Sequence, residues 1–139
     1  MKTIITLALV CFVFCLTGCT SLNKSNATIK AAIDHFHQQY NEGNAGAIWT
    51  EAHAKFRNTT EKTSFETYLL TVQHKLGKVT STANVDLQRS IVNQTTTVHL
   101  SQTTAFEKGK GMETFTLEMV GEDAVLVAYN VQSKELSAK

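Results

Sequence analysis

The spacing of apolar residues changes once along this 139-residue chain, at Gly77. Before Gly77 the apolar residues recur every three or four positions, as on one face of a helix. After it they alternate with polar residues, many of them threonine, which is the period of a β-strand. Neither half can bury its apolar stripe alone. The sequence therefore predicts an α+β fold with three N-terminal helices packed on a curved four-stranded antiparallel sheet.

The first half divides into helices at its glycines and caps. The first helix is expected to end at Gly43, and Asn44 suits the cap of a second, shorter helix over residues 45–54. Residues 56–60 are interpreted as a connection. The third helix is expected to start at residues 63–66, which match a capping box, and to end before Gly77. The apolar face of the first helix consists of Ile29, Ile33, Phe36 and Tyr40.

The second half contains four expected strands joined by turns at residues 93–94, 107–111 and 121–123. In the first strand Val85, Leu87 and Ile91 share a face, and Arg89 has the same register. Residues 133–139 are interpreted as a polar tail. The other three strands are expected to point Val98, Leu100, Phe115, Leu117, Met119, Val125, Val127 and Val131 toward the helices.

The N-terminus has the pattern of a secretory signal. Lys2 precedes an apolar run over residues 4–16, which is shorter than the roughly 20 residues that span a bilayer. The run ends in Leu16, Thr17, Gly18 and Cys19, which resemble the lipobox of bacterial lipoproteins. The alternative is an uncleaved signal anchor with an incidental cysteine.

The lipobox resemblance implies a processed, membrane-anchored protein. Residues 1–18 would be a signal peptide, removed after a diacylglycerol is attached to the Cys19 thiol, and the new amino group would be acylated, typically by palmitate. Residues 19–28 would form a flexible tether, residues 29–136 a single domain and residues 137–139 a tail. Thr20 stands where sorted lipoproteins that stay in the inner membrane have Asp. In a bacterium with two membranes the resemblance therefore implies the periplasmic face of the outer membrane in the cell envelope. In a host with one membrane it implies the outer face of that membrane.

Charge and cysteine content exclude several classes of partner. Of the 13 Lys and Arg residues only Lys2 precedes Cys19, so the remaining chain has 12 basic and 12 acidic residues. The sequence contains no stripe of basic residues, so nothing in it indicates a nucleic-acid partner. Cys11 and Cys15 leave with the signal and Cys19 carries lipid, so neither disulfides nor cysteine metal ligands are expected. Because His35 and His37 point about 200° apart on a helix, and the other histidines are isolated, we interpret the histidines as solvated and expect neither metal nor cofactor.

Three segments, residues 40–49, 76–79 and 106–115, resemble an uncharacterised family of small exported bacterial proteins with a domain of unknown function. The order of elements also resembles the cone-shaped, cystatin-like superfamily of ketosteroid isomerase, nuclear transport factor and polyketide-cyclase-like proteins. The resemblance implies a fold and a location, with no established activity. Ketosteroid isomerases use a buried carboxylate base with a tyrosine and a carboxylic acid as donors.

The expected inner face offers few groups for such chemistry. Glu113 as base and Tyr129 as donor are the catalytic candidates, while Asp86 and His99 fall on the opposite face. The structural alternative is an ion pair of Glu113 with Arg89 and a Tyr129 hydroxyl at the rim. The aromatic residues of the helices are expected to fill the wide end of the core. The alternative is a pocket for an apolar ligand, lined by Tyr40, Trp49, Tyr68 and Tyr129.

The first hypothesis is therefore a non-enzymatic, lipid-anchored envelope protein that binds a protein or a small apolar ligand. The alternative is a small isomerase-like or hydrolase-like enzyme that uses Glu113 and Tyr129. A third possibility is a homodimer formed through the threonine-rich outer face of the sheet, by analogy at the level of the fold.

Overall fold

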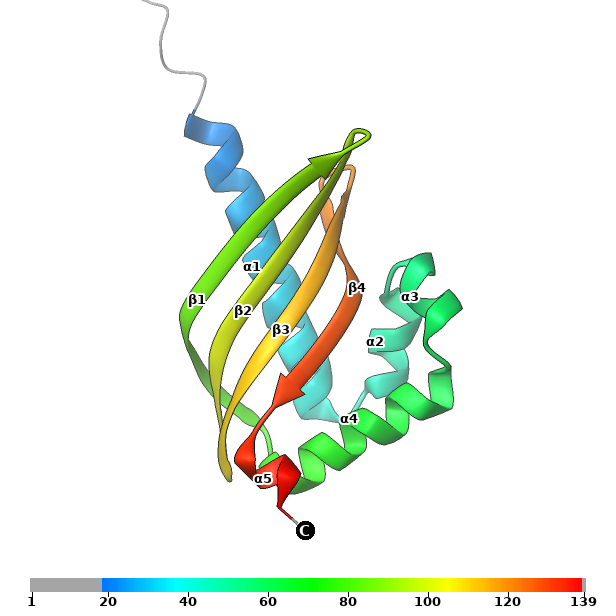
Figure 1. Cartoon of the computed structure of the whole chain (residues 1–139), viewed down its shortest axis with the longest axis vertical. Coiled ribbons are helices and arrows are strands. Elements are labelled where there is room, and N and C mark those ends of the chain that lie inside the picture. The colour runs from blue at the N-terminus through cyan, green and yellow to red at the C-terminus, as the bar shows by residue number, and fades with distance from the viewer. Residues whose placement is uncertain (1–18, 139) are drawn as a thin grey trace, which may run out of the picture.

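The computed structural model describes residues 19–138, so the expected signal peptide with Leu16, Thr17 and Gly18 lies outside the described residues. Helices precede a four-stranded antiparallel sheet, which confirms the α+β class (Figure 1). The elements are α1 (Cys19–Glu42), α2 (Ala45–Glu51), α3 (Ala54–Thr59), α4 (Lys62–Leu76), β1 (Val79–Val92), β2 (Thr95–Phe106), β3 (Gly109–Val120), β4 (Asp123–Gln132) and α5 (Lys134–Ser137).

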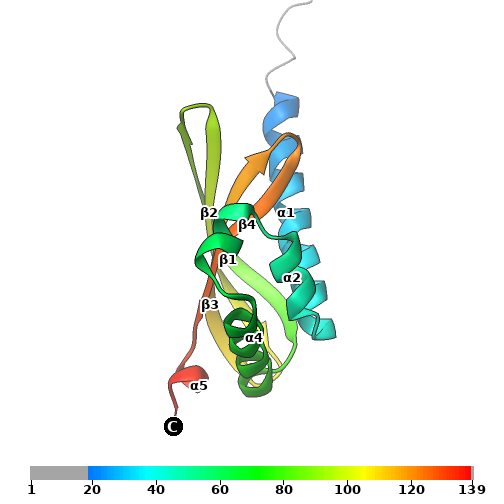
Figure 2. The same cartoon turned by 90° about the vertical axis from the view of Figure 1, so that its right-hand side faces the viewer.

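The sheet is a meander in the order β1-β2-β3-β4, with each hairpin closed by a two-residue turn. Asn93 and Gln94 form the first turn with φ of 49° and 66°, the positive angles of a type I′ hairpin. The turn predicted at residues 93–94 is thus confirmed. Figure 2 shows α1 running along one face of the sheet, with α2 and α4 on the same side.

The core forms where the apolar face of α1 meets the inner face of the sheet. The predicted helical stripe is buried, and so is the expected inward register of β2 and β3. Phe36 packs edge-to-face against Phe115, with ring centroids 5.1 Å apart. The buried apolar residues of these elements are Ile29, Ile33, Phe36, Tyr40, Val98, Leu100, Phe106, Phe115 and Leu117.

The register of the sheet departs from simple alternation at three places, two in β1 and one in β4. In β4, Thr116 pairs with Ala128 but Leu117 pairs with Leu126, so Val127 is the extra residue. Leu126, and not Val127 as predicted, therefore shares the inner face with Leu117. Val125 lines the cleft described below. In β1 a bulge between Ala83 and Asp86 accompanies a positive φ at Asn84, and both Val85 and Ile91 are exposed.

Helix α1 begins at Cys19, ten residues earlier than expected. Residues 19–28, interpreted from sequence as a flexible tether, are helical in the structure. They contain neither Gly nor Pro, and two contacts hold them to the sheet. Lys24 Nζ lies 2.5 Å from Glu122 Oε1, and Arg89 donates to the side chain of Asn26.

Four helices precede the sheet in the described residues, one more than the three expected. Ala52 is extended and ends α2, after which His53 caps α3 by accepting a hydrogen bond from Lys55 N–H. Residues 56–60, predicted as a connection, thus lie mostly in a helix. Helix α4 starts at Lys62, and its cap is Glu61 rather than the predicted box at residues 63–66. A short helix, α5, lies in the predicted tail.

Candidate ligand cleft and buried carboxylate

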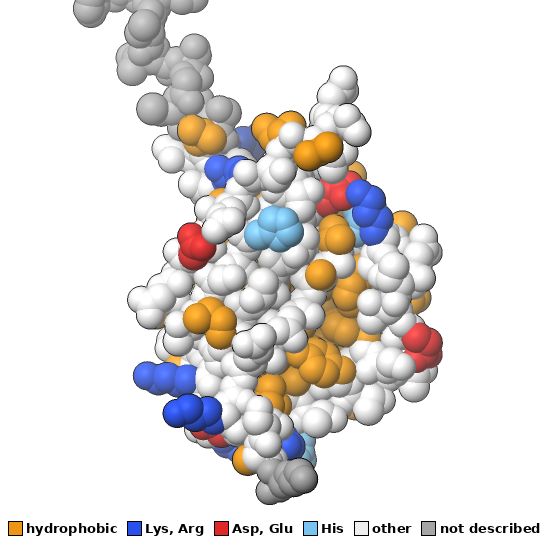
Figure 3. All heavy atoms as spheres, in the orientation of Figure 1, with side chains coloured by type: hydrophobic (Ala, Val, Ile, Leu, Met, Phe, Trp, Pro, Cys, Tyr) orange, Lys and Arg blue, Asp and Glu red, His pale blue; other side chains and the backbone are white. Residues whose placement is uncertain are grey.

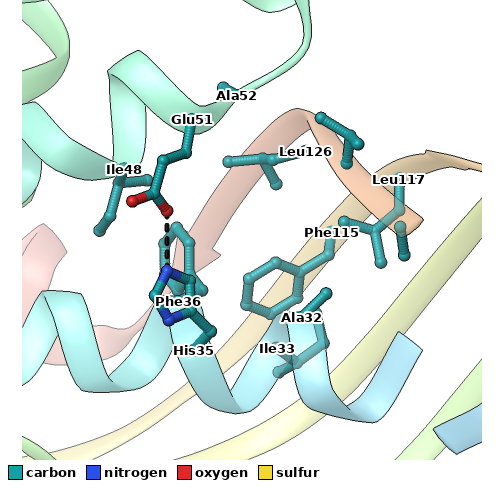
Figure 4. Close-up of a pocket in the computed structure, with 12 residues that line it drawn as sticks. Ala32, Ile33, His35, Phe36, Ile48, Glu51, Ala52, Phe115, Leu117 and Leu126 are labelled. Carbon is teal, nitrogen blue, oxygen red and sulfur yellow. Dashed lines mark hydrogen bonds and ion pairs between the residues drawn. The ribbon is translucent and has the colours of Figure 1, made fainter. Parts of the chain in front are cut away.

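A cleft of about 130 Å³ opens between α1, α2 and the β3–β4 hairpin (Figure 4). Its floor is apolar, with aromatic rings from α1 and β3 and branched side chains from the strands. In the face shown in Figure 3, hydrophobic side chains also gather between β4 and the helices beside it. The cleft is lined by Ala32, Ile33, His35, Phe36, Ile48, Glu51, Ala52, Phe115, Leu117, Ala124, Val125 and Leu126.

Small residues leave this space open. Ala32 on α1, Ala52 at the end of α2 and Ala124 on β4 all line the cleft, where longer side chains would fill it. The bulge in β4 adds to this arrangement because it turns Leu126 inward. The break between α2 and α3 is held by His53 N–H, which donates to the carbonyl oxygen of Leu126 at 2.8 Å.

A polar pair lies beside the apolar floor. His35 Nε2 is 2.7 Å from Glu51 Oε2, and about half of each side chain is exposed to solvent. Figure 4 shows this pair linking α1 to α2 beside the ring of Phe36. The cleft therefore offers one apolar compartment with a hydrogen-bonding imidazole and a carboxylate next to it. The sequence does not predict this pair, because no spacing rule joins residues from two separate helices.

The second notable group is the buried carboxylate of Glu113, which is 1% exposed. Its Oε2 lies 2.8 Å from His37 Nε2 and also accepts hydrogen bonds from Gln102 and Thr104. Its Oε1 accepts a hydrogen bond from the Tyr129 hydroxyl at 2.7 Å. The structure thus brings the two catalytic candidates together. The alternative ion pair of Glu113 with Arg89 is not formed.

The electrostatics of this group favour an ionised carboxylate. Burial alone raises the pKa of Glu113, but the hydrogen bond and charge of His37 and the hydroxyl groups of Thr104 and Tyr129 outweigh it. The pKa of Glu113 consequently lies below its ordinary value. Burial, followed by the charge of Glu113, raises the pKa of Tyr129 well above its ordinary value, so its hydroxyl remains a donor.

Three members of this network were missed from the sequence. His37 is buried, and its interpretation as a solvated histidine was wrong. It continues the helical stripe at the fourth position after Ile33, so a wider apolar face would have included it. Gln102 and Thr104 lie between Leu100 and Phe106 in the same inward alternation, and that spacing could have identified them.

The carboxylate network and the cleft are separate. The rings of Phe36 and Phe115 line the cleft and pack on Tyr129, at centroid distances of 4.6 and 5.0 Å. Neither Glu113 nor Tyr129 lines the cleft. The two aromatic rings therefore form a wall between the cleft and the acid/base pair.

The other aromatic candidates do not gather around one pocket. Tyr40 is buried, and its hydroxyl donates to the carbonyl oxygen of Gly77 at 2.9 Å. Trp49 donates through Nε1 to Thr60, while the Tyr68 hydroxyl accepts from the N–H of Val131. These bonds fix the helices to one another and to β4. None of the predicted pocket residues lines the cleft.

The remaining polar candidates are dispersed. Asp86 accepts a hydrogen bond from Gln88, and His99 contacts Thr116 on the exposed face of the sheet. His53 caps α3 and lies 3.6 Å from Glu118. Within residues 19–138, no three His, Cys, Asp or Glu side chains are grouped so that they could hold a metal ion.

Comparisons of the chain with known protein families, with curated proteins and with solved structures find no match. None of the helices in the described part of the chain is both long and apolar enough to cross a membrane.

Proposed function

We propose that this protein is a lipid-anchored protein of the cell envelope, held through Cys19 at the periplasmic face of the outer membrane, whose domain binds a small apolar ligand. The anchor is supported by the resemblance of Leu16, Thr17, Gly18 and Cys19 to a lipobox. Binding is supported by one structural observation, the apolar cleft beside the pair of His35 and Glu51. The order of elements is also compatible with the cone-shaped superfamily of ketosteroid isomerase and nuclear transport factor.

The dimensions of the cleft limit the ligand. An apolar cavity of about 150 Å³ in another protein stays dry and binds benzene, and this cleft has a volume of about 130 Å³. It therefore suits one aromatic ring or a short alkyl group. A hydroxyl or amine on that group would reach His35 and Glu51, which have exposed polar atoms beside the apolar floor.

Binding can be tested with benzyl alcohol as a probe, using nuclear magnetic resonance of the domain from residue 20 onward. We expect the probe to bind weakly, with a Kd of about 1 mM, and to shift methyl signals of Ile33, Ile48 and Leu126. Ala32→Leu fills the cleft and should abolish these shifts. The matched control is Ala31→Leu, the same change at the exposed neighbouring position on α1, which should leave them intact.

Equal shifts in the Ala32→Leu and Ala31→Leu variants would show that the probe binds elsewhere. Absence of shifts in the wild-type protein at a tenfold higher probe concentration would remove the support for a ligand cleft.

The anchor has an independent test. Mass spectrometry of the chain purified from membranes should show an acylated N-terminus at Cys19, and Cys19→Ser should release the protein from the membrane fraction. An intact Met1 or a free Cys19 thiol would contradict the anchor.

An enzyme that uses Glu113 and Tyr129 is the weaker proposal. The two side chains are joined by a hydrogen bond, but Glu113 is buried and already accepts from four side chains. A substrate would have to displace Phe36 or Phe115 to reach it from the cleft. Binding without catalysis therefore has the stronger support.

A further inference from the structure

Three elements reach one end of the molecule together, and that end carries Cys19. These elements are the start of α1, the β1–β2 hairpin and the β3–β4 hairpin (Figures 1 and 2). The antiparallel register requires both hairpins to lie at the same end of the sheet. The start of α1 is held there by Lys24 to Glu122 and by Asn26 to Arg89.

Exposed apolar side chains gather at this end. Leu22 on α1, Ile91 and Val92 beside the first hairpin turn, and Val120 beside the third are 58%, 73%, 62% and 48% exposed. Figure 3 shows hydrophobic side chains at the same end of the molecule. Single exposed apolar residues are common on soluble proteins. Here, however, three separate elements place such residues at the one end from which the N-terminal segment leaves.

The position of Cys19 identifies a bilayer as the surface that would cover them. An acyl chain on Cys19 lies in the membrane, and Leu22 follows three residues later in the same helix, about 4.5 Å along its axis. Leu22 is therefore within one helical turn of the anchored residue, close enough for its side chain to enter the headgroup boundary.

Two basic side chains at this end are already paired within the protein, while Asp123, opposite Val120, is an exposed acidic group. Lys24 is neutralised by Glu122, and Arg89 is hydrogen-bonded to Asn26. Asn93 and Gln94, at the tip of the first hairpin, supply polar groups for the headgroups, while Ile91 and Val92 flank them.

We propose that Leu22, Ile91, Val92 and Val120 form a bilayer-contacting surface that holds the long axis of the domain away from the membrane plane. This proposal rests on the lipid anchor proposed for Cys19. A second protein or a second copy of the chain on this surface would keep the labels away from the lipid, and the experiment below counts that outcome against the proposal.

The test uses the full chain, purified from membranes and reconstituted into phosphatidylethanolamine and phosphatidylglycerol vesicles that contain a nitroxide-labelled lipid. Val92→Cys and Val120→Cys variants are labelled with an environment-sensitive fluorophore. The matched control is Leu70→Cys on α4, which is similarly exposed at 53% but lies away from this end (Figure 1). We expect the nitroxide to quench the labels at positions 92 and 120 at least about twofold, and the label at position 70 hardly at all.

The wild-type chain, which has no added cysteine, tests the lipid anchor separately from the bilayer-contacting surface. An acylated Cys19 takes up no fluorophore. Labelling of the wild-type protein would overturn the anchor and this surface with it. Without such labelling, unquenched labels at positions 92 and 120 would overturn the surface alone, whether those labels face water or a protein. Equal quenching at all three positions would mean that the domain lies flat on the bilayer, which also overturns the proposal.

Discussion

The carboxylate of Glu113 gives the most direct test of the core. It is 1% exposed and accepts hydrogen bonds from His37, Gln102, Thr104 and Tyr129. Glu113→Gln keeps the size of the side chain but removes its charge and turns one acceptor oxygen into a donor. Glu113→Leu removes both acceptors. The two variants therefore separate the contribution of the charge from that of the hydrogen bonds.

The structure sets the expected magnitudes. The lowered pKa of Glu113 means that the fold stabilises the carboxylate better than water does, so loss of the charge is unfavourable. In Glu113→Gln at least one donor also loses its acceptor, and we expect a loss of about 2–3 kcal/mol in the free energy of unfolding. Glu113→Leu leaves Gln102 and Thr104, 3% and 0% exposed, without an acceptor and should lose about 4 kcal/mol or more.

Urea unfolding of the domain from residue 20 onward, followed by circular dichroism near pH 7, measures these losses. With an m-value of about 2 kcal/mol per molar urea, the Glu113→Gln midpoint should fall by about 1–1.5 M. The matched control is Glu122→Gln, the same change in an exposed ion pair, and its midpoint should fall by no more than about 0.5 M because such a pair contributes at most about 1 kcal/mol. A Glu113→Gln midpoint equal to that of the wild-type protein, or Glu113→Leu more stable than Glu113→Gln, would refute the reasoning.

The pH dependence follows from the direction of the pKa shift. Because the pKa of Glu113 is lower in the folded protein than its ordinary value of 4.5, the carboxylate stabilises the fold above pH 4.5. This contribution is lost as the pH falls through the folded-state pKa. The stability difference between wild-type protein and Glu113→Gln should therefore be larger above pH 4.5 than below the folded-state pKa of Glu113. A difference that persists undiminished at pH 2 would contradict the assignment of the charge.

Two further predictions concern backbone positions with positive φ. Gln94 has φ of 66° in a type I′ turn, so Gln94→Gly should raise the free energy of unfolding by about 0.5–1 kcal/mol; an unchanged or lower thermal midpoint would contradict this. Gly77 has φ of 78°, and a Cβ there would lie 2.5 Å from Glu107 Oε2. Gly77→Ala should therefore destabilise the protein by about 1–2 kcal/mol or more in urea unfolding, and wild-type stability would show that the end of α4 can adjust.

The sequence could predict the elements whose signal is local and periodic. The apolar stripe from Ile29 to Tyr40 and the alternating apolar residues around Phe115 both lie in the core. The turn also lies at Asn93 and Gln94, the polar pair from which it was predicted. The bulge in β4 was not predictable from alternation, because it depends on how Leu126 packs against the helices.

Contacts between residues that lie far apart in the sequence were also not predictable. Glu113 and Tyr129 were identified from shared strand parity, whereas the imidazole of His37 meets Glu113 from a position 76 residues away. The cleft depends on three small residues from three elements, Ala32, Ala52 and Ala124, and no sequence pattern marks an alanine as the wall of a cavity. The helical start of α1 also depends on the distant contacts of Lys24 and Asn26.

The continuous α1 links the proposed anchor to the proposed ligand cleft. Ala32 follows Cys19 by 13 residues in one helix, which places the cleft about 20 Å along the helix axis from the anchored residue. The headgroup layer on one side of a bilayer is about 6 Å thick. If α1 stands away from the membrane, as the apolar end of the domain indicates, the cleft opens into water above the headgroups. An acyl chain would have to leave the bilayer to enter it, so this geometry favours a dissolved ligand with a single apolar group over a membrane lipid.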